Sequence, residues 1–190
     1  MSLVPSWLEK PILAIALTLI VAGCASEAAP PLPGVYMVSG ANHKTSSEHW
    51  EVSISERDGL TSAAVMSSDQ GNLLQLVCYQ SDKSLTLMMV PEHKLDSPVG
   101  ARRLLIGFDG APPTEVSWTA RDLKGGYSEF EVESSYVSFP ATIRTFKAHG
   151  TVRAVFREGG KATRTYDFSL TAADKAIDYV LAACGKQVGG

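Results

Sequence analysis

Short segments in which apolar and polar residues alternate cover most of the chain between residues 35 and 170, and turn signals separate them. Because successive side chains of a strand point to opposite faces, this alternation predicts half-buried β-strands. The segments are "HWEVSIS", "SAAVMSS", "LLQLVCY", "SLTLMMV", "RRLLIGFD", "EVSWTA", "YSEFEVES", "TVRAVFRE" and "ATRTYDFSL". Runs of strands without interleaved long helices predict antiparallel sheets and argue against a repeated βαβ fold.

Turn residues join two pairs of these segments into predicted hairpins, through "QSDK" and "EGGK". A short helix is expected over residues 140–149, because Pro140 suits the first turn of a helix. A second helix is expected over residues 171–184, with Thr171 as N-cap and Gly185 just past its end. The predicted fold class is therefore α+β and mainly antiparallel β, as a sandwich-like domain or a curved sheet, closed by a C-terminal helix.

An uncharged apolar stretch of thirteen residues, "PILAIALTLIVAG", precedes Cys24. This length is typical of the h-region of a signal peptide, whereas a membrane span needs ~20 residues. Its end, "VAGC", resembles the lipobox of bacterial lipoproteins, in which the cysteine thiol receives diacylglycerol and a peptidase cleaves before the cysteine. The alternatives are an ordinary signal peptide, an uncleaved signal anchor, and a buried helix with a free thiol.

The lipobox interpretation divides the chain into a signal peptide (1–23), a lipidated cysteine with a proline-rich tether (24–34), one mainly-β domain (35–185) and a flexible tail (186–190). An ordered strand packed on the domain is the alternative to the tether. Several acyl chains, palmitate among them, would anchor Cys24 stably in membrane lipid. By resemblance to enteric lipoproteins, Ala25 at the next position predicts the outer membrane, with the domain facing the periplasm.

The chain carries a formal net charge of −3. With no basic excess and no recognition motif for DNA or RNA, nucleic acid is not expected as a partner. An acidic group precedes a basic tract, and the members of the two are Glu115, Asp122, Glu129, Glu131 and Glu133, then Arg144, Lys147, Arg153, Arg157, Lys161 and Arg164. We interpret them as two solvated faces of one domain, with a charged docking patch as the alternative.

Two cysteines remain once Cys24 is lipidated. Alternation places Cys78 on the apolar face of its strand, and helical spacing places Cys184 on the apolar face of the last helix. An even number of cysteines in an oxidising compartment predicts one disulfide, Cys78–Cys184. Two separate buried thiols are the alternative.

No local signature of an enzyme occurs in the sequence, such as a nucleophile elbow, a phosphate-binding loop or an HExxH motif. The four histidines, which show no metal-ligand spacing, are His43, His49, His93 and His149. The last helix offers Asp174, Lys175 and Asp178, which we interpret as cap or solvated residues. A Ser-His-Asp triad assembled from distant residues is the alternative. We therefore expect no catalytic residues, no metal and no cofactor other than the lipid on Cys24.

Three aromatic residues, Trp50, Trp118 and Tyr127, are candidates for lining a binding groove. At strand spacing, tryptophans are more often core or cross-strand partners, and we favour that interpretation for both. The segment "FDGAPP" is interpreted as a turn, with a recognition loop as the alternative. The sequence does not identify the binding residues.

Three segments together resemble a group of bacterial envelope proteins: "LQLVCYQSDKSLTLMMV", "IGFDGAPPTEVSW" and "YDFSLTAADKAIDYVLAAC". The group includes the invasion-associated locus B-like proteins and an accessory periplasmic protein of type VI secretion. The positions that match are Cys78, Phe108, Asp109, Pro112, Trp118, Phe168, Leu170 and Cys184. The chain departs from the group at Thr171-Ala172, where a glycine is frequent. The resemblance implies a noncatalytic envelope module and the same cysteine pair.

These observations favour a lipid-anchored interaction or accessory module of a secretion or adhesion system, with an envelope protein as its partner. The first alternative is an inhibitor or immunity lipoprotein that blocks a cell-wall hydrolase or a toxin. An envelope hydrolase is the second alternative.

Overall fold

The computed structural model describes residues 35–38, 45–69, 71–92, 95–123, 127–159 and 161–186. These residues belong to one compact unit, Pro31–Gly190. The predictions for the signal peptide, Cys24, the tether and nearly all of the tail fall outside the described residues, as do His43 and His93.

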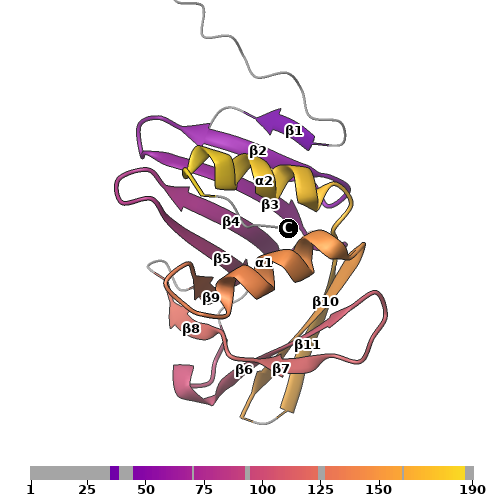
Figure 1. The fold of residues 1–190 in the computed structure, drawn as a ribbon. Coiled ribbons are helices and arrows are strands. Elements are labelled where there is room, and N and C mark those ends of the chain that lie inside the picture. The colour runs from indigo at the N-terminus through magenta and orange to yellow at the C-terminus, as the bar shows by residue number, and fades with distance from the viewer. Residues whose placement is uncertain are drawn as a thin grey trace, which may run out of the picture. The chain divides into compact units, whose positions relative to one another are not determined.

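The described residues form a seven-stranded sheet and a four-stranded sheet (Figure 1). The order of the first is β1 (Val35–Val38), β2 (Trp50–Ser55), β3 (Leu60–Met66), β4 (Leu73–Tyr79), β5 (Ser84–Val90), β9 (Ser128–Glu133) and β8 (Thr119–Asp122). Strand β1 runs parallel to β2, and the other neighbours are antiparallel. Both predicted hairpins form, as β4–β5 in this sheet and β10–β11 in the other.

The order of the four-stranded sheet is β11 (Lys161–Ser169), β10 (Thr151–Glu158), β6 (Arg102–Phe108) and β7 (Thr114–Val116), and a 3₁₀ turn at Val99–Ala101 leads into β6. The predicted strand "EVSWTA" is therefore wrong as a single element. Its first half pairs with β6, and its second half pairs with β9 in the other sheet. Apolar and polar residues continue to alternate where the chain passes from one sheet to the other, because both halves keep an apolar face. The sequence pattern therefore does not reveal that the second half pairs with a different strand.

Two helices pack against the sheets, α1 (Phe139–Ala148) and α2 (Ala173–Ala183). Helix α2 contacts β2, β3, β4 and α1 (Figure 1). It buries Ile177, Val180 and Leu181 in a core that both sheets share. The fold class predicted from the sequence is confirmed: mainly antiparallel β with a helix near the C-terminus. Neither described helix is long and apolar enough to cross a membrane.

The two ends of α2 differ in how well the sequence predicted them. The expected N-cap, Thr171, is wrong: Ala172 occupies the cap position with φ 61°, and no side chain bonds the first turn. The amide of Ala173 donates to the Leu170 carbonyl instead, so a tight backbone turn starts the helix. At the other end Gly185 has φ 67° and donates to Ala182, as a C′ glycine does.

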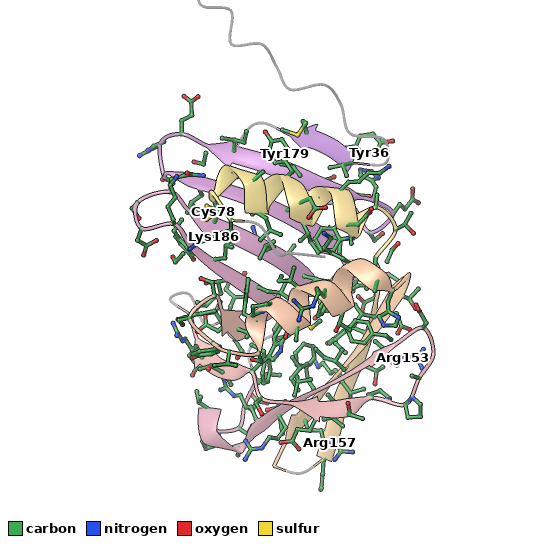
Figure 2. All side chains as sticks on the ribbon, viewed as in Figure 1. Tyr36, Cys78, Arg153, Arg157, Tyr179 and Lys186 are labelled. Carbon is green, nitrogen blue, oxygen red and sulfur yellow. A yellow bond between two sulfur atoms is a disulfide. The ribbon has the colours of Figure 1, made fainter. Side chains whose placement is uncertain are left out.

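The disulfide between Cys78 and Cys184 is confirmed, with a Cα–Cα distance of 5.7 Å. Both residues are fully buried, Cys78 on β4 and Cys184 at the C-cap of α2. Figure 2 labels Cys78 close to that end of the helix. The bridge ties the last helix to the centre of the seven-stranded sheet.

Candidate functional site

The face of the seven-stranded sheet opposite α2 carries a group of polar side chains that the strand register brings together. Along β9, Phe130 and Val132 enter the core, so alternation directs Glu129, Glu131 and Glu133 to the other face. In the neighbouring strand β8, Arg121 lies opposite Glu129. On the other side β5 brings its residues beside the same carboxylates.

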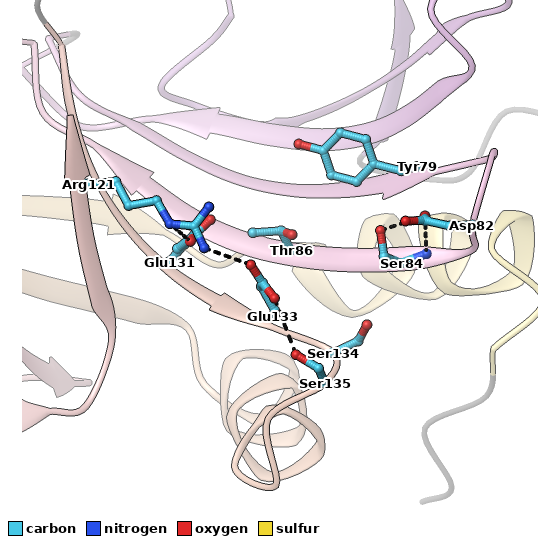
Figure 3. Close-up of a pocket in the computed structure, with 9 residues that line it drawn as sticks. All are labelled: Tyr79, Asp82, Ser84, Thr86, Arg121, Glu131, Glu133, Ser134 and Ser135. Atoms are coloured by element: carbon cyan, nitrogen blue, oxygen red, sulfur yellow. Dashed lines mark hydrogen bonds and ion pairs between the residues drawn. The ribbon is translucent and has the colours of Figure 1, made fainter. Parts of the chain in front are cut away.

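A polar groove of about 380 Å³ lies on this face (Figure 3). Nine residues line it: the hydroxyl-bearing Tyr79, Ser84, Thr86, Ser134 and Ser135, the acidic Asp82, Glu131 and Glu133, and Arg121. Figure 3 shows the Tyr79 ring on one side of the groove, with Arg121 and Glu131 at its far end. We call this site the polar groove.

Ion pairs and hydrogen bonds hold the polar groove in place. The Arg121 guanidinium pairs with Glu131 through Nε and donates from Nη2 to Glu133 Oε1 at 2.9 Å. The Ser135 hydroxyl donates to the second oxygen of Glu133 at 3.2 Å. These contacts fix the donors and acceptors before any ligand arrives.

Burial shifts the pKa values of titratable residues in and beside the polar groove. Glu129 and Glu131 are 6% and 4% exposed, and this desolvation raises the pKa of both carboxyls, against the opposing effect of Arg121. Burial likewise raises the pKa of Tyr79, and the charges of Glu129 and Glu131 add to it. The interpretation of these two glutamates as solvated residues is therefore wrong, whereas the basic residues Arg153 and Arg157 are exposed as expected.

We expect Glu129→Gln to stabilise the domain at neutral pH. A carboxyl whose pKa is raised by folding stabilises the fold most when protonated, and that contribution is lost as pH rises from the ordinary glutamate pKa of 4.5 through the raised pKa of the folded state. The free energy of unfolding of the variant should exceed that of the wild type at pH 7, and the gap should close below about pH 4. Urea unfolding at several pH values measures this. Exposed Glu56→Gln is the control, and an equal gain in that variant would contradict the explanation.

An apolar groove of about 230 Å³ lies between α1 and the β6–β7 hairpin. Phe108, Trp118 and Phe146 line it together with Ile106 and Val116, while Ser138, Thr142 and Thr145 on or beside α1 are its polar members. The Phe108 and Phe146 rings meet edge to face with centroids 5.2 Å apart, and Trp118 lies 6.2 Å from Phe146. We call this site the apolar groove.

The turn after β6 fixes one end of the apolar groove. Asp109, at φ 49°, accepts hydrogen bonds from the amides of Gly150 (3.0 Å) and Thr151 (2.8 Å). Its second oxygen pairs with His149 Nδ1 at 2.8 Å, and the His149 ring stacks on Phe108 with centroids 4.8 Å apart. The hydrogen bond from His149, with those from the two amides, lowers the pKa of Asp109. This turn therefore holds Phe108 against the end of α1.

The residues singled out in the sequence fall in different places. Trp50 is fully buried as expected, and Trp118 is partly buried, packs against the core and also lines the apolar groove. Tyr127 is half exposed and lines neither groove. His49 pairs with Glu51. Among the residues that the structure describes, no group of three or more His, Cys, Asp or Glu side chains could hold a metal ion.

Sequence reasoning missed the polar groove, although one signal for it existed. Three glutamates alternate with Phe130 and Val132 in "EFEVE", which places three carboxylates on one strand face. The contribution of Arg121 and Tyr79 depends on the order of the strands. Searches against protein-family models, curated proteins and solved structures find no match for this chain.

Proposed function

We propose that this chain is a lipid-anchored envelope protein whose domain is a noncatalytic interaction module, accessory to a secretion or adhesion system. The "VAGC" sequence supports attachment of lipid at Cys24, and through Ala25 placement in the outer membrane facing the periplasm. The Cys78–Cys184 disulfide supports an oxidising compartment such as the periplasm.

The apolar groove is the structural feature that best supports the proposed interaction role. At about 230 Å³ it is smaller than the ~300–1,000 Å³ of small-molecule sites, but it suits one apolar side chain of a protein partner. Aromatic residues that line such a pocket, with polar residues at its rim, are the usual composition of an interface hot spot. Phe108, Trp118 and Phe146 would hold that side chain, and Thr142 and Thr145 would lie at the rim.

Crosslinking in living cells, followed by purification of the lipidated protein from membranes, tests this function. The expected result is recovery of several subunits of one envelope machine, with loss of these subunits in the Cys24→Ala variant. Recovery of no protein partner by either form would overturn the proposal.

Truncating the aromatic wall of the apolar groove is expected to weaken partner capture. Trp118→Ala should reduce the affinity about 30-fold, since hot-spot residues contribute about 2 kcal/mol or more. Thr142→Arg, which fills the groove from the helix side, should have a similar effect without opening a cavity. Tyr127→Ala is the matched control, because this exposed aromatic lies outside the groove. Titration of the captured partner measures all three, and equal binding by all would contradict the assignment.

The loop between β9 and α1 favours the alternative function, an inhibitor or immunity lipoprotein. Val137 in this loop is fully exposed and Tyr136 is 37% exposed, so the loop presents apolar side chains to solvent. A protruding apolar side chain suits insertion into the cleft of a cell-wall hydrolase or toxin. Recovery of one such enzyme, retained in Cys24→Ala and lost in Val137→Asp, would favour this function.

A further inference from the structure

We propose that the polar groove binds a carbohydrate. This site is separate from the apolar groove, so the inference does not depend on the proposed interaction role. The lining residues, the charge balance and the position of Tyr79 each bear on the kind of ligand, and they agree.

The size and lining of the polar groove select a hydroxyl-rich ligand. A volume of about 380 Å³ falls within the ~300–1,000 Å³ range of small-molecule sites. Such sites are ordinarily lined by apolar side chains, but here every lining residue has a side-chain oxygen or nitrogen. Hydroxyls both donate and accept, carboxylates accept, and a guanidinium donates. The groove can therefore accept a hydrogen bond from a sugar O–H and donate one to the same sugar oxygen. An apolar ligand would leave these groups desolvated and unpaired.

The charge balance argues against an anionic ligand. Three carboxylates line the groove against one guanidinium, and Arg121 already binds Glu131 and Glu133. A phosphate or carboxylate ligand would meet this excess of negative charge. The ligand class that remains is a neutral sugar or an amino sugar, whose hydroxyl or ammonium donors meet the free lone pairs of the carboxylates.

The hydrogen bonds of the polar groove leave some groups open to a ligand. Among the described residues, none forms a hydrogen bond with the Thr86 hydroxyl or with the Tyr79 hydroxyl, although both residues line the groove. Tyr79 is 38% exposed, so its ring offers an apolar face to the C–H groups of a sugar while its hydroxyl can bond to the ring substituents.

Glu129 lies beside the polar groove, on the same face of β9 as Glu131 and Glu133. It is 94% buried, and the charge of Arg121 only partly offsets the rise in its pKa that burial causes. A buried carboxyl with a raised pKa is costly, and such groups gather at functional sites. The carboxyl lies opposite Arg121, so it adds negative potential behind the guanidinium that helps to line the groove.

Binding of soluble trisaccharides to the purified full-length protein tests the proposal. The probes are maltotriose, cellotriose and chitotriose. Saturation-transfer NMR and calorimetry measure their binding. At least one trisaccharide should bind saturably. Its affinity should fall about fivefold in Tyr79→Ala and in the isosteric Thr86→Val, since each loses a contact or hydrogen bond of about 1 kcal/mol. Tyr127→Ala, a second exposed tyrosine, should bind like the wild type.

Three results would overturn the assignment. The first is no binding of any probe at millimolar concentration. The second is binding that neither Tyr79→Ala nor Thr86→Val weakens. The third is saturable binding of spermidine with no binding of sugars, which would identify the groove as a cation site. Capture of an envelope protein through the apolar groove would be unaffected by any of these results, so failure here is distinguishable from failure of the proposed function.

Discussion

Replacing Cys78 and Cys184 together by serine is expected to lower the free energy of unfolding by about 4–5 kcal/mol. The disulfide joins residues 106 positions apart, so its loss returns the conformational entropy of a long loop to the unfolded chain. Both positions are buried, but a polar group lies near each sulfur: Gln80 Nε2 is 3.5 Å from Cys78 Sγ, and the Ser84 carbonyl is 3.4 Å from Cys184 Sγ. A serine hydroxyl therefore has a polar neighbour at both positions, and the lost loop constraint is the main cost. Such a loss is comparable with the whole stability of many domains, about 5–15 kcal/mol.

Urea unfolding of the full-length protein, with and without a thiol reductant, measures this effect. The reductant should destabilise the wild type by a similar amount and leave the double serine variant unchanged. Cys78→Ala with Cys184→Ala is the second variant, since it removes the bridge without adding hydroxyls. A wild type insensitive to reduction, with variants of equal stability, would show that the bridge contributes nothing to the folded domain.

The sequence predicted this disulfide because both of its ends lie in elements with a clear periodicity. Alternation in "LLQLVCY" and helical spacing in "AIDYVLAAC" each place the thiol on the buried face, and the structure confirms both faces. The class of fold follows for the same reason. Periodicity is a local property, and it is readable without knowing which strand lies beside which.

Strand order is a long-range property, and the features that the sequence did not predict depend on it. Tyr79 and Arg121 are 42 positions apart, and they line one groove only because β9 lies between β5 and β8. The burial of Glu129 has the same origin, since an alternating strand does not reveal whether its polar face is covered. Trp118 lies where the chain crosses between sheets, so strand spacing, which indicated its packing against the core, does not reveal that it also lines the apolar groove.

The chain crosses between its two sheets several times, and Arg102 connects them at one of these places. It begins β6 in the four-stranded sheet and is 4% exposed. Its guanidinium donates from Nε to the Ser97 carbonyl and from Nη2 to the Leu95 carbonyl, both at 2.8 Å. From Nη1 it reaches two strands of the other sheet, at Asp122 Oδ1 (2.5 Å) on β8 and Ser128 Oγ (3.2 Å) on β9.

We expect Arg102→Met to lower the free energy of unfolding by about 3–5 kcal/mol, the usual cost of breaking a buried charge network from one side. Methionine fills much of the volume but leaves two backbone carbonyls without their donor, and water cannot replace it in a buried site. The free energy of unfolding of Arg102→Lys should lie between those of the wild type and Arg102→Met, because one ammonium has three donors and cannot span four acceptors. Arg103→Met is the matched control: its side chain is half exposed, so water can replace it at Glu115 and at the Gly100 and Arg102 carbonyls, and about 1 kcal/mol or less is at stake. If the two methionine variants unfold at the same urea concentration, Arg102 does not hold the sheets together, and the shared apolar core alone does so.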